Sequence, residues 1–321
     1  MAAMSRRLLL AAAPGLALPA ALRAQALPTV RFVVPFAAGG QTDVIARLVA
    51  QHMAQTLGHT IVVDNRPGGN AIIASEAVSR APKDGLTVLV GGTAGLPLNV
   101  LLRPGLPYRI EDFAPVALLY DGPLSLTINA ALPPRDIAGF VAYAKASPDP
   151  LRYATNGTGS VSHLFGLLMA EAMGIDLVDV VYRGSGPATT DLLAGTIEIG
   201  VEAPSTTLGH IRAGKLRLLG LSFAERAPLF PEVPTFKEAG YPELVAGFWT
   251  GLLCPAGTPP EQVARLNAAA NRAMESAPIR ERLAGEALRA ISGPPDLLQR
   301  QMEQDMRQWR GIIKEKGITL D

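Results

Sequence analysis

One stretch of the chain reads Val34-Pro35-Phe36-Ala37-Ala38-Gly39-Gly40-Gln41-Thr42-Asp43. The β-branched run that ends at Val34 and the helix-period pattern that begins after Gly40 predict a strand, a glycine turn and a helix. Two glycines allow backbone N–H groups to turn toward one point, and the helix start adds partial positive charge. The turn can therefore hold an anion, but an ordinary strand-to-helix turn with Asp43 near the helix cap explains the same spacing.

This turn lacks the signatures of two nucleotide-binding loops. No Gly-Lys-Ser/Thr follows it, so it is not a Walker A loop, and the absence of G-x-G-x-x-G rules out a dinucleotide fingerprint.

Around the turn, short β-branched runs alternate with helix-period segments, a pattern typical of parallel sheets covered by helices. Apolar residues in the segment 44–57 recur at three- and four-residue spacing and form one stripe on a helix that Gly58 ends. A similar stripe over residues 164–173 repeats the plan in the middle of the chain. Strands are expected at residues 29–34, 60–64, 87–91, 114–120, 124–129, 178–182, 197–201, 216–222 and 251–253.

The repeated plan predicts an α/β protein with two lobes. We place the two chain crossings near residues 130–134, at Pro133-Pro134, and near residues 247–249. Lobe 1 then comprises residues 27–129 and 250–321, and lobe 2 comprises residues 130–249. The segment 261–316 is mostly helical and is expected to pack back on the first lobe.

Composition restricts the function classes. The 321 residues carry 29 Lys and Arg against 28 Asp and Glu, a formal charge of +1, which argues against a nucleic-acid partner. The single cysteine, Cys254, cannot form an intramolecular disulfide, and the four histidines show no metal-ligand spacing. No structural metal site is expected.

The N-terminus has the pattern of a signal peptide over residues 1–26. Ser5-Arg6-Arg7 is followed by an apolar run over residues 8–21 and by the small residues of Ala24-Gln25-Ala26. The Arg pair also resembles a twin-arginine signal, and Sec export is the alternative. Without Arg6, Arg7 and Arg23 the basic count falls from 29 to 26 against 28 acidic residues, so the mature chain from Leu27 carries −2.

A second glycine turn reads Tyr153-Ala154-Thr155-Asn156-Gly157-Thr158-Gly159-Ser160-Val161-Ser162-His163. Its hydroxyls and the free amides of the following helix form another arrangement suited to an anion, although a solvent-facing helix cap remains an alternative. In open α/β sheets ligands bind at the carboxyl ends of strands. Two such turns facing each other from two lobes would hold a dicarboxylate.

The sequence offers no catalytic constellation. The hydrolase elbow G-x-S-x-G is only approximated by Gly220-Leu221-Ser222-Phe223-Ala224. His163 and Ser160 could suggest a base and a nucleophile, but residues at a helix start are expected to point to different sides of the turn, so we interpret His163 as bonding the loop backbone. Glu202 ends a predicted strand near the expected cleft, where it can orient water, accept from a ligand or be solvated. We expect no enzyme, with a secreted cleft hydrolase as the weaker alternative.

Eight ordered blocks give the mature chain a family resemblance. They are Val34-Pro35-Phe36 with Gly39-Gly40-x-x-Asp43, Asn65-Arg66-Pro67-Gly68, Ala81-Pro82-Lys83-Asp84-Gly85, Gly157-x-Gly159-Ser160-x-x-His163, Tyr182-Arg183-Gly184-Ser185, His210-Ile211-x-Ala213-Gly214-Lys215-Leu216, Pro231-x-Val233-Pro234-Thr235, and Pro255-Ala256-Gly257-Thr258-Pro259. With these blocks the chain resembles the tripartite tricarboxylate transporter substrate-binding receptors, also called Bug-type periplasmic binding proteins.

The resemblance implies a monomeric, two-lobe periplasmic binding protein of type II that closes about hinge strands on a small carboxylate. Delivery to a membrane permease of the tripartite tricarboxylate type is implied, without a cofactor; an orphan receptor that feeds a sensor is the alternative. The sequence does not distinguish a dicarboxylate, an aromatic acid and an amino acid as the ligand. The expected ligand contacts are Phe36, Ala38, Gly39, Gly40, Thr42, Asp43, Thr93, Asn156, Gly157, Thr158, Gly159, Ser160, His163, Arg183 and Glu202.

Three positions depart from the family pattern. Gly68-Gly69-Asn70-Ala71-Ile72 moves an asparagine forward by two positions, Arg183 stands where relatives often have lysine, and Glu202 where they often have aspartate or a small residue. An arginine can bind a carboxylate through two parallel N–H groups if it reaches the cleft.

Overall fold

The computed structural model describes residues 28–320 of the chain. The predicted signal peptide, residues 1–26, lies outside these residues. Within residues 28–320, none of the helices combines the length and the apolar character that crossing a membrane requires.

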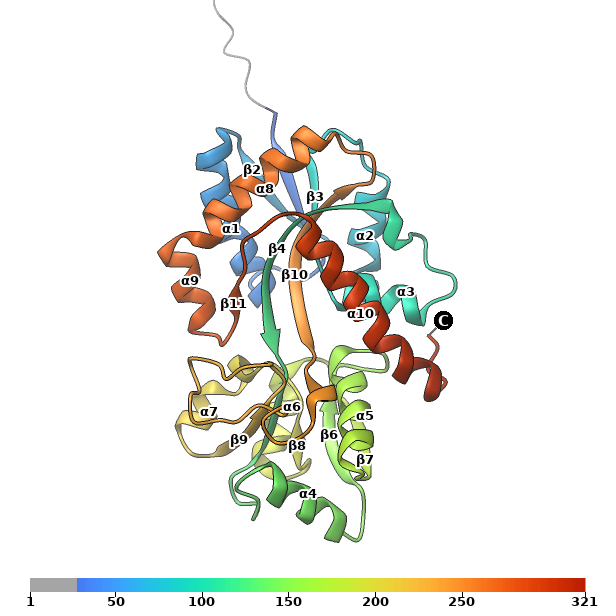
Figure 1. Cartoon of the computed structure of the whole chain (residues 1–321), viewed down its shortest axis with the longest axis vertical. Coiled ribbons are helices and arrows are strands. Elements are labelled where there is room, and N and C mark those ends of the chain that lie inside the picture. The colour runs from blue at the N-terminus through green and yellow to red at the C-terminus, as the bar shows by residue number, and fades with distance from the viewer. Residues whose placement is uncertain (1–27, 321) are drawn as a thin grey trace, which may run out of the picture.

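The first lobe is built on a six-stranded sheet with the order β11-β4-β10-β3-β1-β2 (Figure 1). Strands β1, β2 and β3 are parallel, whereas β10 runs antiparallel to both β3 and β4. The bounds are β1 Val30–Val34, β2 Ile61–Asn65, β3 Thr87–Gly92, β4 Phe113–Pro123, β10 Gly247–Pro255 and β11 Arg289–Ala290.

The second lobe contains a five-stranded sheet with the order β7-β6-β8-β5-β9. Strand β6 is parallel to β7 and β8, and β5 is antiparallel to β8 and β9. The bounds are β5 Ser125–Asn129, β6 Leu151–Thr155, β7 Leu177–Val181, β8 Ile199–Gly200 and β9 Leu216–Leu221. The two sheets lie one above the other along the long axis of the molecule (Figure 1).

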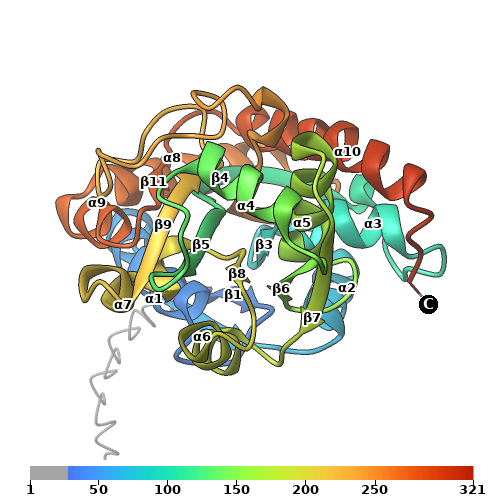
Figure 2. The same cartoon turned by 90° about the horizontal axis from the view of Figure 1, so that it is seen from below.

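Helices cover both sheets. In the first lobe these are α1 Gln41–Leu57, α2 Ile72–Ser79, α3 Asn99–Leu102, α8 Pro260–Glu275 and α9 Ala277–Ala284. In the second lobe they are α4 Ile137–Ala146, α5 Val161–Met173, α6 Ser185–Ala194 and α7 Leu208–Arg212. Seen from below, α4 and α5 lie on one side of the second sheet and α6 on the other (Figure 2). Accordingly, Tyr153 of β6 packs with α5, while its neighbour Ala154 packs with α6.

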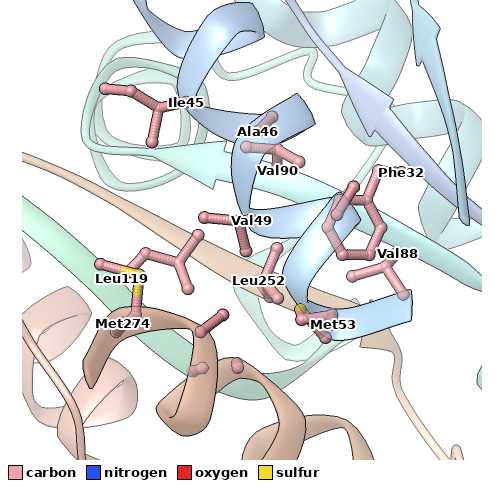
Figure 3. Close-up of a cluster of buried hydrophobic side chains, with 14 of the residues drawn as sticks. Phe32, Ile45, Ala46, Val49, Met53, Val88, Val90, Leu119, Leu252 and Met274 are labelled. Carbon is pink, nitrogen blue, oxygen red and sulfur yellow. The ribbon is translucent and has the colours of Figure 1, made fainter. Parts of the chain in front are cut away.

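The predicted apolar stripe on α1 is buried in the core of the first lobe. Val49 and Met53 are fully buried against Phe32 of the sheet and Met274 of α8 (Figure 3). The helix ends at Gly58, whose φ of 70° lies in the left-handed region that glycine adopts without strain. The βαβ unit expected from the sequence is therefore confirmed.

The chain changes sheets at Leu124, between β4 and β5, and returns at the start of β10. At this level β10 pairs with β4, with Gly247 opposite Pro123. The crossing expected at residues 130–134 comes one strand after this change of sheet. Pro133-Pro134 follows β5, which pairs in the second sheet, and the Pro134 carbonyl accepts from Arg217 of β9 at 2.7 Å. We infer a lobe boundary at Leu124, so β5, placed in lobe 1 by the division at residue 130, belongs with the second lobe.

The last helix, α10 Asp296–Glu315, contacts both lobes. Its first half buries Leu298 and Met302 with the first lobe, and its second half buries Trp309 and Ile312 with the core next to α5. Lys316 at its end lies 3.6 Å from Glu171 of α5. The expectation that the C-terminal segment packs on the first lobe is therefore incomplete.

Candidate functional site

A cleft of about 680 Å³ lies between the lobes, and a smaller cavity of about 140 Å³ continues it toward the first sheet. The two share Phe36, Ala94, Val161 and Phe248 in their walls, so we treat them together as the interlobe cleft. The remaining lining residues of the larger part are Asn70, Leu124, Asn156, Ser160, Ser162, Val181, Tyr182, Arg183, Gly184, Ser185, Val201, Glu202, Ala203 and Thr206. The smaller part adds Pro35, Gln41, Thr42, Ala71, Val90, Gly91, Gly92, Thr93, Gly95, Tyr120, Trp249 and Thr250.

The start of α1 forms one wall of the smaller cavity. Gly40 is the N-cap residue, and the amides of Gln41 and Thr42, at the first two helical positions, have no partner within the helix. The Gly39 N–H is not available to a ligand, because it donates to Asp43 Oδ2 at 2.8 Å. A ligand at this wall therefore meets the first turn of α1 rather than the glycine amide itself.

Asp43 organises the α1 turn from behind. Its buried carboxylate accepts from Arg47, Asn65 and the Gly39 amide. The Arg47 hydrogen bond is the largest influence on Asp43 and, with the Gly39 and Asn65 bonds, outweighs burial and lowers its pKa to about 2. Asp43 does not line the interlobe cleft, and both of its oxygens accept hydrogen bonds from the turn and its neighbours.

The start of α5 forms a second wall. Ser160 is the N-cap residue, and its hydroxyl accepts the His163 N–H at 3.2 Å. The amides of Val161 and Ser162 have no partner within the helix, and both residues line the cleft. The Asn156 and Ser160 side chains lie beside them, so this wall offers several donors to one anion.

His163 is buried behind the α5 turn. Its Nδ1 accepts the Gly159 N–H at 3.2 Å, which assigns the ring proton to Nε2 when the imidazole is neutral. Burial lowers the pKa of His163, which favours that neutral form. The interpretation that His163 bonds the loop backbone is confirmed.

A third helix start, that of α6, also lines the cleft, although only Arg183 beside it was expected to contact the ligand. Gly184 is the N-cap residue with a φ of 103°, and Ser185 opens the helix. The segment Tyr182-Arg183-Gly184-Ser185 follows β7 and has the same signal as the other two turns, a glycine between a strand and a helix. Arg183 is exposed and makes no hydrogen bond or ion pair with any other described residue.

Glu202 lies on the same wall as Arg183. Its Oε2 atom is buried and has no hydrogen-bond partner among the described residues. Burial raises the pKa of Glu202 more than the nearby Ser185 and Thr206 hydroxyls lower it. No ion pair joins Glu202 to Arg183 in the described part of the chain.

The predicted site residues divide into two groups. Those that line the interlobe cleft are Phe36, Thr42, Thr93, Asn156, Ser160, Arg183 and Glu202. Those that lie in the same two turns but do not line it are Ala38, Gly39, Gly40, Asp43, Gly157, Thr158, Gly159 and His163. Polar lining residues missing from the prediction are Asn70, Ser162, Tyr182, Ser185 and Thr206. Of these, Asn70 belongs to the segment that departs from the family pattern, and its amide bonds Asn99.

Comparison with protein families identifies this architecture. Residues 45–318 match the model of the tripartite tricarboxylate transporter family receptor. The chain belongs to this receptor family. The resemblance seen in the sequence is confirmed, and so is the α/β, two-lobe binding-protein fold.

Members of the receptor family are similar along almost their whole length. The protein BugT of Bordetella pertussis is 34% identical over 311 residues, which covers 96% of this chain and 95% of BugT. The structure of MatC from Rhodopseudomonas palustris with bound malate is 36% identical, covers 89% of this chain and 99% of MatC, and gives a TM-score of 0.76. Another R. palustris protein, solved with adipate, is 31% identical, covers 91% and 98% of the two chains, and gives a TM-score of 0.79.

Proposed function

We propose that the protein is an exported receptor that captures a small carboxylate in the interlobe cleft and delivers it to a membrane permease of the tripartite tricarboxylate type. The observation that carries this proposal is that the first turns of α1, α5 and α6 all line one cleft. Unpaired amides and the partial positive charge of each helix start favour an anion.

Arg183 strengthens the preference for an anion. Because the Arg183 guanidinium has no hydrogen-bond or ion-pair partner among the described residues, it can donate two parallel hydrogen bonds to a carboxylate. Malate and adipate, which are bound in the structures of two related proteins, are both small carboxylates. The binding residues proposed are those predicted residues that line the cleft, together with the α6 start; the predicted residues behind the turns position them.

Carboxylate capture can be tested by calorimetry on the mature protein. Dicarboxylates of four to six carbons, aromatic acids and amino acids are titrated, and each is compared with its neutral amide. At least one acid should bind with a dissociation constant near or below about 1 μM, and its amide about a hundredfold more weakly. Equal binding of acid and amide, or no binding of any acid, would contradict the proposal.

Delivery to a permease needs a cellular measurement. Uptake of the labelled ligand should fall when the gene is deleted and recover when the wild-type protein is restored. Loss of a transcriptional response with unchanged uptake would instead identify a receptor that feeds a sensor.

Export is testable through the N-terminus. The mature protein should be recovered from the periplasmic fraction without residues 1–26. Replacing Arg6 and Arg7 by lysine should stop export if the twin-arginine route is used and leave it intact if the Sec route is used. Recovery in the cytoplasm with both arginines attached would contradict export by either route.

A further inference from the structure

Two opposite charges share one wall of the interlobe cleft without pairing. Arg183 and Glu202 are the only charged side chains among the described residues that line it. No ion pair links them within residues 28–320, although opposite charges gain from pairing when they come close. Each is therefore available to a group on the ligand.

A negative charge at Glu202 is unfavourable in a cleft that binds a simple anion. The three helix starts and Arg183 all favour negative charge, whereas a carboxylate at Glu202 repels a second carboxylate on the ligand. Burial of its Oε2 atom without a hydrogen-bond partner among the described residues also disfavours the ionised form, consistent with the raised pKa of Glu202. A donor on the ligand would remove both disadvantages at once.

The Glu202 carboxyl has unused capacity to accept hydrogen bonds. A carboxylate offers about four lone-pair sites, and the Ser185 and Thr206 hydroxyls are its only polar neighbours that influence its pKa. Behind it lies a separate cavity of about 10 Å³, also lined by Thr207, whose Oγ1 lacks a hydrogen-bond partner among the described residues. That volume admits one water molecule at most, so it cannot satisfy the carboxyl fully.

We propose that Glu202 selects ligands with a hydrogen-bond donor beside the carboxylate, in the first place an ammonium group and in the second a hydroxyl. This inference rests on the proposed function, because it assigns the ligand's carboxylate to the helix starts and Arg183. The substrate class is then the 2-amino or 2-hydroxy carboxylates rather than unsubstituted dicarboxylates. An ammonium pairs with the charge of Glu202, whereas a hydroxyl only needs an acceptor.

The test uses three matched ligand sets in calorimetry. They are succinate, malate and aspartate; adipate, 2-hydroxyadipate and 2-aminoadipate; and 3-phenylpropionate, phenyllactate and phenylalanine. In the set that fits the cleft, the wild-type protein should bind the donor-bearing members at least about tenfold more tightly than the unsubstituted member.

Two substitutions separate charge from fold. Glu202→Gln should bring the ammonium ligand to within about threefold of the unsubstituted one, with a smaller loss for the hydroxyl ligand. Glu243→Gln, an exposed carboxylate of the second lobe outside the cleft, makes the same chemical change and should leave all affinities unchanged. Glu202→Asp keeps the charge and should retain part of the preference; the wild-type ratio tests the inference even if Glu202→Gln folds poorly.

Two outcomes would contradict the role of Glu202, and a third would contradict the proposed function as well. Equal wild-type affinity for unsubstituted and donor-bearing ligands, or an unchanged preference in a folded Glu202→Gln variant, would show that Glu202 does not select the ligand while carboxylate capture stands. Failure of every member of all three sets to bind the wild-type protein would overturn the proposed function itself.

Discussion

Ser160 begins α5, where its hydroxyl accepts the His163 N–H and the residue lines the interlobe cleft. Ser160→Ala should weaken the bound carboxylate by about 1 to 3 kcal/mol, because an anion loses a charge-assisted donor. It should also lower the free energy of unfolding by about 1 kcal/mol through the lost N-cap. Calorimetry and urea unfolding measure the two effects separately.

Asp136 provides the matched control for Ser160. It caps α4 in the same way, by accepting the Gly139 N–H at 2.7 Å, but does not line the cleft. Asp136→Ala should reduce stability by a similar amount of about 1 kcal/mol and leave affinity unchanged. If both variants lose stability but neither loses affinity, the Ser160 hydroxyl does not contact the ligand.

Asp43 makes stability depend on pH at the acid end. Its pKa of about 2 in the folded protein lies below the value of about 4 in the unfolded chain, so the unfolded state binds more protons between these pH values. The stabilising contribution is complete above about pH 4 and is lost as the pH falls toward about 2. We expect about 1 kcal/mol, allowing for the half-exposed Arg47 partner.

Replacing Asp43 by asparagine should remove this acid dependence. Urea unfolding between about pH 2 and pH 5 should give a smaller slope for Asp43→Asn than for the wild-type protein. Equal slopes would show that the Arg47 and Gly39 bonds do not favour the ionised carboxyl.

At the scale of elements, α10 carries a buried acid next to the returning strand β10. Asp305 accepts from Trp249 Nε1 at 2.7 Å and from Gln301 at 2.9 Å, yet burial raises its pKa to about 6. The folded protein therefore binds more protons than the unfolded chain between about pH 4 and pH 6, and its stability falls as the pH rises through this range. The resulting decrease in the free energy of unfolding is about 3 kcal/mol, and it is complete above about pH 6.

Asp305→Asn should flatten this part of the stability profile. The pH window of Asp43 lies below about pH 4, so urea unfolding from about pH 4 to pH 7 leaves its contribution out, and the difference between Asp305→Asn and the wild-type protein gives the contribution of Asp305. Asp296→Asn, at the exposed start of the same helix, makes the same chemical change outside the core and serves as the control for the substitution itself. A slope that persists in Asp305→Asn would assign it to other groups.

The sequence predicts elements well where one local pattern decides them. The stripe over residues 44–57 predicts α1 almost to its ends. All nine predicted strands, β1 among them, overlap strands of the two sheets. Strand β6 was missed, because Leu151-Arg152-Tyr153-Ala154-Thr155 mixes a charge and small residues with few β-branched ones. Its place between β7 and β8 depends on pairing with distant segments, which local periodicity does not report.

The candidate site shows the same limit. A glycine turn before a helix identified the starts of α1 and α5, but not which amides remain open. Gly40 has a φ of −73°, which any residue adopts. Gly39 has a φ of 85°, and its N–H donates to Asp43. Such internal use of donors follows from side-chain positions in three dimensions, so the sequence predicts the turns and not which of their amides face the cleft.

At the scale of the whole molecule, we predict that ligand binding closes the lobes about Leu124 and the start of β10. A ligand that contacts both lobes binds the closed form better and shifts the population toward it. Solution scattering should show a smaller radius of gyration with saturating ligand. The Ser160→Ala variant should need more ligand to reach the same value.

Unchanged scattering with a bound ligand would contradict closure. For a ligand with a dissociation constant of about 1 μM, it would mean that the free protein is already closed or that the ligand contacts one lobe. Either result would contradict shared binding by α1 and α5.

The position of α10 has a mechanical consequence. Two strands that cross side by side permit both bending and twisting between the bodies they join. A rigid helix that packs on both bodies and is bonded to β10 at the crossing resists the twist and leaves bending as the main degree of freedom. The lobes should therefore meet in the same orientation at every closure, so that ligands are discriminated by the groups they present and not by the path along which the walls approach.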